Sequence, residues 1–246
     1  YQEAKVSYDR LKNIDGIEEE KQGELTLDLI TEVDTNLNFS YKNGRDVIKN
    51  KKVKFEAGRI YAVVGSNGIG KTTLVKLIIG IYHPNGNVKS EIKYNNIPIQ
   101  RINLEYLRGE KIAYVSQKHR MTNKKINELF CEIEKDIKID SIYNCLSYFN
   151  DEELIGNVLD DIKLFWNSAY YELSEGEKQI LSIYRILCKK PEVLILDEPS
   201  SNLDFNKKIT LKKILRVIKK QMIVIVISHD KDFLDVSDEV IELDKR

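Results

Sequence analysis

The stretch GSNGIGKT, residues 65–72, constrains the fold more than any other part of the sequence. It follows the apolar run RIYAVV and precedes the helix-patterned KTTLVKLIIG, which is the strand–loop–helix setting that a G-x-x-x-x-G-K-[ST] loop requires. Glycines in such a loop let successive backbone N–H groups surround a phosphate, and the following helix presents its positive end. An ordinary glycine turn is the alternative. The context favours a nucleotide-binding α/β fold.

The chemistry expected of this loop is phosphate and metal binding. Lys71 is expected to bridge the β- and γ-phosphates of ATP, and the Thr72 hydroxyl to ligate Mg²⁺. The whole predicted ATP-binding set here is Gly65, Ser66, Asn67, Gly68, Ile69, Gly70, Lys71, Thr72 and Thr73.

A second apolar run, VLIL, leads directly into two carboxylates in VLILDEP, residues 193–199. We expect Asp197 to hold Mg²⁺ and Glu198 to act as the general base that polarises an attacking water. The alternative is that both acids lie on a plain surface turn. Four apolar residues running straight into the pair favour the catalytic interpretation.

Composition sets limits on the partners. The 246 residues suit one or two compact domains. Lys plus Arg and Asp plus Glu are both 39, so no global field attracts nucleic acid, and we expect no nucleic-acid partner. The three cysteines lack metal-ligand spacing, which fits a reduced compartment. The apolar run at 222–227 is too short to span a bilayer. The chain opens with Tyr1 instead of Met, which we interpret as a piece of a longer polypeptide.

The order of patterns along the chain predicts the organisation. Residues 1–33 mix acids and bases and are expected to be a linker, and residues 34–246 to be the folded domain. An Asn-Gly turn at 42–46 predicts a hairpin in an N-terminal β lobe. Residues 118–172 are helix-patterned and predict an inserted helical subdomain.

The rest of the chain alternates helices with strands, which predicts a mostly parallel sheet covered on both faces. The expected elements are helices at 175–189 and about 206–219, strands at 193–196 and 222–228, then a helix and a last strand near Val240.

Six further short motifs occur along the chain, and their order is informative. They are FSY with Tyr41, YVSQ ending at Gln117, LSEGE at 173–177, LDEP at 196–199, SNLD at 201–204, and SHD with His229. Together with the phosphate loop, this order resembles the ATP-binding cassette family, the nucleotide-binding domains of ABC transporters, over nearly the whole chain. The resemblance implies an α/β P-loop NTPase with a RecA-like, mostly parallel sheet core, an N-terminal antiparallel β lobe and an inserted α-helical subdomain.

The resemblance also implies an ATP-dependent homodimer in which two ATPs are held head to tail. Each ATP lies between the phosphate loop of one copy and the signature loop of the other, here Ser174, Gly176 and Glu177. The D-loop residue Asp204 would contact the opposite copy. Asn202 in that loop is a minor departure, since the family often has alanine there.

Three further roles follow from the resemblance. Tyr41 would stack on adenine, and the switch histidine, His229, would bond the γ-phosphate. Gln117 would touch Mg²⁺ and the attacking water and relay the nucleotide state to a membrane partner. The implied cofactors are ATP and Mg²⁺, and the implied metal ligands are Thr72, Gln117 and Asp197.

The signature loop departs from the family pattern Leu-Ser-Gly-Gly-Gln at Glu175 and Glu177. A carboxylate about 8 Å from a phosphate charge costs on the order of 2 kcal/mol per charge pair at an effective dielectric near 20. Ser174 and Gly176, whose hydroxyl and backbone make the family's phosphate contacts, are retained. Ser174 is also a natural N-cap that forms an S-x-x-E capping box with Glu177. We therefore expect the acids to point away from phosphate or to serve as caps.

The N-terminal segment YQEAKVSYDRLKNID resembles the linker between membrane helices and cassette in bacterial peptide and bacteriocin exporters, lantibiotic exporters included. It favours the motor domain of an exporter, joined to a transmembrane domain at the cytoplasmic face of the membrane. A free-standing importer subunit is one alternative. A soluble ABC ATPase acting on DNA or the ribosome is another, but the chain has neither a long coiled coil nor a second cassette. FWNSAYYE replaces the exporters' usual Thr/Val/Gly/Glu-rich stretch before the signature.

Overall fold

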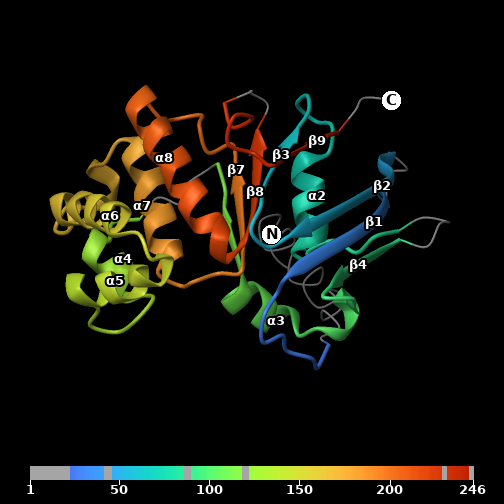
Figure 1. The fold of residues 1–246 in the computed structure, drawn as a ribbon, viewed down its shortest axis with the longest axis horizontal. Coiled ribbons are helices and arrows are strands. Elements are labelled where there is room, and N and C mark those ends of the chain that lie inside the picture. The colour runs from blue at the N-terminus through green and yellow to red at the C-terminus, as the bar shows by residue number, and fades with distance from the viewer. Residues whose placement is uncertain (1–22, 42–45, 86–89, 118–121, 229–231, 244–246) are drawn as a thin grey trace, which may run out of the picture.

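A parallel sheet forms the centre of the molecule (Figure 1). The computed structural model describes residues 23–41, 46–85, 90–117, 122–228 and 232–243. Five strands pair in parallel in the order β6-β7-β8-β3-β9. Their bounds are β3 Ile60–Val64, β6 Ile112–Val115, β7 Val193–Asp197, β8 Ile223–Ser228 and β9 Glu239–Glu242. Nearly every residue of β3, β7 and β8 is buried, as expected of parallel strands covered on both faces.

Alternate residues of these strands belong to two different cores, because successive side chains point to opposite faces of a sheet. In β7, Leu194 and Leu196 pack with the helices on one face, whereas Val193 and Ile195 pack with the β lobe on the other. The first face carries α7 Glu175–Leu187 and α8 Phe205–Ile218; the second carries α2 Lys71–Ile78 (Figure 1). The sheet therefore separates the phosphate-loop helix from the helix that follows the signature motif.

A second, antiparallel sheet packs beyond α2 and forms the predicted β lobe. Its strand order is β2-β1-β4-β5, with bounds β1 Glu32–Ser40, β2 Asp46–Glu56, β4 Glu91–Tyr94 and β5 Ile97–Pro98. Ser40 pairs with Asp46 across the predicted hairpin, while residues 42–45 of its Asn-Gly turn lie outside the described residues. Leu27 and Ile30, in the predicted linker, are buried in the core of this lobe.

The predicted helical insertion is present as short helices at the side of the central sheet (Figure 1). They are α4 Ile126–Cys131, α5 Ile139–Leu146, 3₁₀ turns at Ser147–Phe149 and Tyr170–Glu172, and α6 Glu152–Phe165. Between the lobe and β6 lie a 3₁₀ turn Ile99–Arg101, α3 Leu104–Tyr106 and a π turn Leu107–Lys111. A last 3₁₀ turn, Lys219–Gln221, follows α8.

One predicted element is wrong. The helix expected between β8 and the last strand is a succession of turns over the described residues 232–236. Phe233 and Val236 are buried there, and that spacing satisfies a turn as well as a helix.

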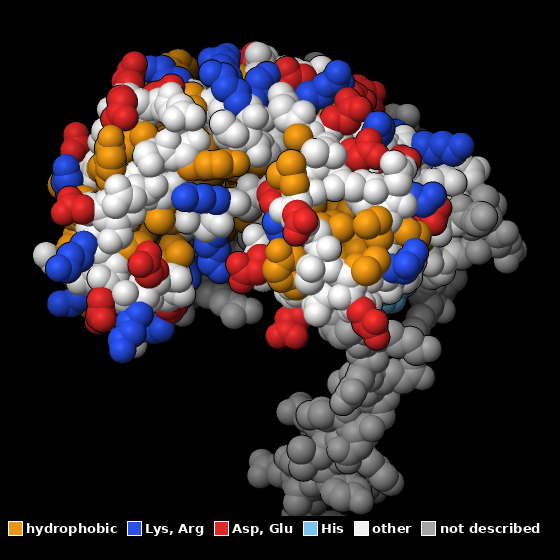
Figure 2. Space-filling view, turned by 60° about the horizontal axis from the view of Figure 1, so that its bottom comes forward, with side chains coloured by type: hydrophobic (Ala, Val, Ile, Leu, Met, Phe, Trp, Pro, Cys, Tyr) orange, Lys and Arg blue, Asp and Glu red, His pale blue; other side chains and the backbone are white. Residues whose placement is uncertain are grey.

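Within the described ranges, no helix combines the length and the apolar character needed to cross a membrane. Lys and Arg side chains are interspersed with Asp and Glu over the face in Figure 2.

Candidate nucleotide site

The parallel register aligns the ends of the strands that carry the predicted site. Val64, the last residue of β3, pairs with Ser228 of β8, and Asp197 of β7 pairs with Ile227. The phosphate loop and the two carboxylates therefore follow their strands at one edge of the sheet, where ligands of α/β proteins bind. His229 itself lies outside the described residues.

The backbone of the phosphate loop uses its glycines at positions where another residue would be strained. Gly70, the N-cap of α2, has a φ of 118°, and a Cβ there would lie 2.7 Å from Val47 Cγ1. Gly68 has a φ of 77°. Side chains disfavour both conformations, so the loop depends on glycine for its shape. Ser66, Asn67 and Gly68 are exposed at its tip, as a loop that meets a ligand should be.

Lys71 points back into its own loop. Its side chain is buried and donates to the Gly65 carbonyl at 2.6 Å. The Lys71 ammonium also lies 3.8 Å from Glu198 Oε1, which brings the cation predicted to bind phosphate and the predicted base together.

Glu198 is held in an unusual backbone conformation. Its φ is 52°, in the left-handed region that non-glycine residues rarely adopt, and its N–H donates to the Ile227 carbonyl at 2.8 Å. Glu198 is buried, with 8% of its surface exposed. Such strain persists where surrounding structure enforces it and is common at functional sites.

Asp197 has a partner that the sequence analysis missed. The Tyr114 hydroxyl donates to Asp197 Oδ2 at 2.8 Å, from the neighbouring strand β6. Burial raises the pKa of Asp197 above its ordinary value, and the Tyr114 bond opposes that rise. Tyr114 lies within the YVSQ motif, but only the pairing of β6 with β7 reveals the contact.

The donor set fits Mg²⁺ supplied together with ATP. The described residues contain no cluster of three or more His, Cys, Asp or Glu side chains able to hold a metal ion. Mg²⁺ is usually held by one or two carboxylates together with substrate phosphates and water. Asp197 provides the carboxylate, and the predicted ligands Thr72 and Gln117 are both exposed.

Tyr41 lies next to the first turn of α2. Its hydroxyl is 2.8 Å from Thr73 Oγ1, and its ring meets Phe39 edge-on at 5.1 Å between centroids. The Tyr82 ring also meets the Tyr41 ring edge-on, at 6.0 Å between centroids. An aromatic ring is therefore present beside the phosphate loop, and its stacking on adenine stays a prediction.

The signature motif forms the predicted capping box. The Ser174 hydroxyl accepts from the N–H of Glu177 at 3.3 Å, and a carboxylate oxygen of Glu177 accepts from the N–H of Ser174 at 2.8 Å. The same oxygen lies 2.8 Å from the Ser174 hydroxyl. Partial burial raises the pKa of Glu177, but the two bonds from Ser174 outweigh it and hold the pKa below its ordinary value. The expectation that Glu177 serves as a cap is confirmed.

Glu175 is paired with a buried lysine. Its carboxylate accepts from Lys178 at 2.7 Å; the Lys178 side chain is 5% exposed and that of Glu175 is 54% exposed. The Lys178 ammonium also lies 5.8 Å from the centre of the Tyr170 ring. The sequence analysis missed this i,i+3 pair, which the spacing of acid and base could have shown.

The signature helix lies against the predicted D-loop of the same chain. A Cβ built on Gly176 would be 2.6 Å from the Asn202 carbonyl oxygen, so only glycine permits this approach. Asp204 caps α8 by accepting from the N–H of Lys207 at 2.9 Å. Lys207 lies 4.0 Å from Glu177 and 3.5 Å from Asp204. Ser174, Gly176, Glu177 and Asp204 thus form a second group, on the face of the sheet opposite to α2.

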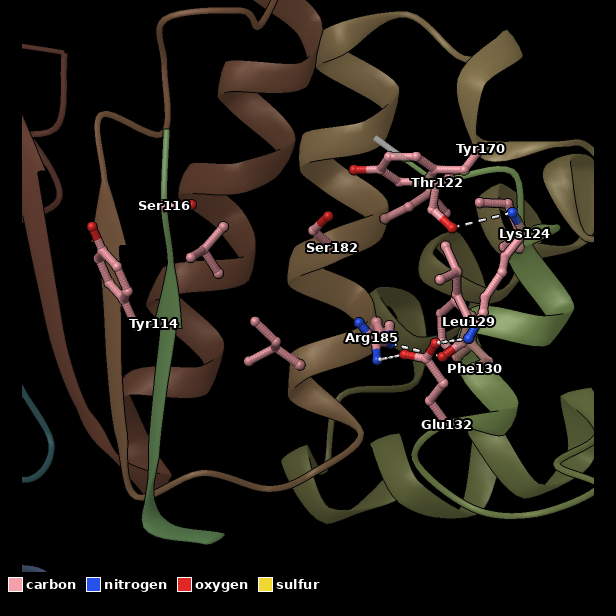
Figure 3. Close-up of a pocket in the computed structure, with 14 residues that line it drawn as sticks. Tyr114, Ser116, Thr122, Lys124, Leu129, Phe130, Glu132, Tyr170, Ser182 and Arg185 are labelled. Atoms are coloured by element: carbon pink, nitrogen blue, oxygen red, sulfur yellow. Dashed lines mark hydrogen bonds and ion pairs between the residues drawn. The ribbon is translucent and has the colours of Figure 1, made fainter. Parts of the chain in front are cut away.

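Next to Ser116, the residue before Gln117, a cavity of about 580 Å³ opens between β6, α4 and α7 (Figure 3). Ser116, just after β6, borders it, as do Ser182 and Arg185 from α7, whereas the Tyr114 ring points to the opposite face of the sheet (Figure 3). Arg185 and Lys124 both bind Glu132, at 2.5 Å and 2.6 Å. Apolar side chains complete the lining, namely Val115, Ile126, Leu129, Phe130, Leu181 and Ile186.

A family profile described as "ABC transporter" matches residues 48–201, more than half of the chain. The chain belongs to the ABC transporter family. In this family the ATP-binding domain, to which the matched motifs belong, hydrolyses ATP to drive transport.

Known relatives support the assignment. A probable ABC transporter ATP-binding/permease protein of Haemophilus influenzae is 29% identical over 85% of this chain. The zinc import ATP-binding protein ZnuC of Buchnera aphidicola is 31% identical over 76% of it. The chain spans 37% of the Haemophilus protein and 70% of the Buchnera protein.

A solved structure confirms the predicted fold class. The structure of a bacterial Atm1-family ABC exporter with ATP bound matches 96% of this ABC chain, with a TM-score of 0.78 and 23% identity, and the match covers 42% of that exporter chain.

Proposed function

We propose that the chain is the ATP-binding and ATP-hydrolysing motor domain of an ABC exporter, working as a head-to-tail homodimer around two ATPs. The observation that carries the proposal is the separation of two half-sites. Lys71 and Glu198 meet at 3.8 Å at the edge of the sheet, whereas the exposed Ser174 starts a helix on the face opposite to α2. Each half-site is completed when a second copy presents the other half.

The geometry suggests how hydrolysis proceeds. Lys71 exchanges the Gly65 carbonyl for phosphate oxygens, and the N–H groups of the loop and of the start of α2 bind the same phosphates. Glu198 accepts a proton from water as the water oxygen attacks the γ-phosphorus, and the bond to the ADP oxygen breaks. Asp197, Thr72 and Gln117 would hold Mg²⁺, which would supply positive charge to the phosphates. Tyr114 keeps Asp197 oriented through its hydroxyl.

The remaining predicted roles form part of the same proposal. Tyr41 stacks on adenine, His229 bonds the γ-phosphate, and Asp204 contacts the second copy. The linker precedes the cassette, and because Leu27 and Ile30 are buried we place the start of the packed lobe near residue 25 instead of 34. The helical subdomain at residues 118–172 follows the Q-loop.

An exporter is favoured over an importer by the relatives. The Haemophilus protein is described as an ATP-binding/permease protein, and this chain spans 37% of it, which leaves length for a transmembrane domain. A free-standing ATPase subunit is the second candidate, favoured by the match to a zinc import ATP-binding protein. Peptide or bacteriocin cargo rests on the likeness of residues 1–15 alone, and those residues lie outside the described ones.

We place the transmembrane partner at the cavity next to Ser116, on the cytoplasmic side of the membrane. This cavity adjoins the predicted Q-loop and has an apolar lining with a charged rim of Lys124, Glu132 and Arg185. Such a lining suits an amphipathic segment of a partner.

The change Glu198→Gln tests the proposed function. It removes the base but keeps the shape, so ATP hydrolysis should fall by about 10²- to 10⁴-fold while an ATP-bound dimer accumulates in sedimentation. The control is Glu105→Gln, an exposed glutamate at α3, which should hydrolyse ATP like the unchanged chain. Undiminished hydrolysis by Glu198→Gln, or no hydrolysis by the unchanged chain, would contradict the proposal.

A further inference from the structure

Gln179 is an unpaired amide in the interior. It is 0% exposed, and neither its side-chain oxygen nor its side-chain nitrogen has a hydrogen-bond partner among the described residues. Buried side-chain polar atoms in native proteins nearly always have a partner, so an exception calls for a specific reason. The proposed function leaves this residue without a role.

Gln179 lies one turn of α7 beyond Gly176. Residues three and four apart share a helix face, so Gln179 lies on the buried side together with Gly176 and Ile183. On this side Gly176 lies against the Asn202 carbonyl: a Cβ added to Gly176 would be 2.6 Å from the Asn202 carbonyl oxygen. The loop 198–204, which begins with the predicted base and ends with the D-loop aspartate, therefore packs against this face of α7 one turn before Gln179.

That loop is tied to the rest of the fold at both ends. At its start, Glu198 donates its N–H to the Ile227 carbonyl at 2.8 Å; at its end, Asp204 caps α8. Between these points, Ser201 and Leu203 donate their N–H groups to earlier carbonyls of the loop itself, at 3.3 and 3.1 Å. Its middle, at Asn202, contacts α7 one helical turn before Gln179.

We propose that Gln179 is a positioning residue that couples the signature helix to Glu198, on the basis of the proposed function. Its amide is unpaired in the resting arrangement and bonds the backbone of loop 198–204 when Ser174 engages the ATP held by a second copy. The bond fixes the loop, and with it the Glu198 carboxylate, in the position for hydrolysis. The engagement of Ser174 with ATP on the second copy is thereby transmitted to the position of Glu198 in the same chain as Ser174.

The test is Gln179→Met in the full chain, since methionine matches the length of glutamine without its hydrogen-bonding groups. Hydrolysis should lose about 10- to 100-fold in kcat, the scale of a misplaced catalytic group, while the KM for ATP stays unchanged. Without nucleotide, the Tm should stay the same or rise, because no bond is lost and a buried unpaired amide is removed. The control is Gln100→Met, at an exposed glutamine, which should change neither kcat nor KM.

Each alternative outcome decides the matter. A kcat equal to that of the unchanged chain would overturn the coupling while leaving the proposed ATPase function intact. A lower Tm without nucleotide would show that the amide is already bonded at rest, and would overturn it too. No hydrolysis by the unchanged chain would remove the proposed function and this inference together.

Discussion

The phosphate loop and the signature loop are both helix N-termini proposed to hold the same phosphate, yet they are built in opposite ways. The phosphate loop has three glycines, and it keeps the buried cation Lys71 against its own Gly65 carbonyl. The signature loop has one glycine, and its acids are used internally: Glu177 caps the helix and Glu175 pairs with Lys178. Both acids of the signature loop therefore already have partners within α7.

Because both signature acids have partners, their repulsion of phosphate is smaller than the sequence alone predicts. About 2 kcal/mol per carboxylate–phosphate pair applies to an unpaired charge. Lys178, 2.7 Å from Glu175, offsets that carboxylate locally, and the N–H and hydroxyl of Ser174 do the same for Glu177. The cost of approaching phosphate is correspondingly smaller.

Among the changes that compare the two loops, the largest effect should come from the phosphate loop. Lys71→Ala removes a charge-assisted bond to phosphate, so the affinity of the chain for ATP should fall by about 10- to 100-fold in calorimetry. Lys220→Ala, at an exposed lysine after α8, is the control and should bind ATP normally. Unchanged affinity in Lys71→Ala would remove the phosphate-loop assignment.

A second prediction concerns the fit of the signature helix. Gly176→Ala puts a methyl group 2.6 Å from the Asn202 carbonyl oxygen, so unfolding free energy should drop by about 1–3 kcal/mol, measured by denaturant titration. Gly156→Ala is the matched control, because its Cβ meets nothing within 4 Å inside helix α6, and it should stabilise by about 0.5–1 kcal/mol. Equal effects of the two changes would show that the D-loop contact is not tight.

The smallest effect should come from the capping glutamate. Glu177→Gln weakens the capping box and should cost about 1 kcal/mol at pH 7, with hydrolysis within a few-fold of the unchanged chain. The pKa of Glu177 is lower in the folded chain, so its stabilisation is complete above the unfolded pKa of about 4.3 and is lost as pH falls through the folded pKa. The stability difference between the two chains should therefore vanish in acid. A constant difference from pH 7 to pH 2 would show that the charge of Glu177 does not act in the cap.

The sequence predicted what depends on local pattern. The phosphate loop, the order of strands and helices and the Ser174 capping box all follow from short-range spacing. The Tyr114–Asp197 bond was missed because it joins residues far apart in sequence that only the pairing of β6 and β7 brings together. Leu27 and Ile30 were assigned to the linker together with the charged residues before them, although Leu25, Leu27 and Leu29 alternate with polar residues as in an extended segment. The turns at 232–236 were misread because buried Phe233 and Val236 imitate helical spacing.

The central claim is that each site combines two copies, and mixing two inactive variants tests it most directly. Lys71→Ala disables the phosphate loop, and Ser174→Asp keeps an N-cap while placing a negative charge against phosphate. In a mixed head-to-tail dimer one site has both halves intact, so an equimolar mixture should recover about a quarter of the unchanged chain's ATPase rate. A mixture no more active than the two variants measured separately would contradict the account.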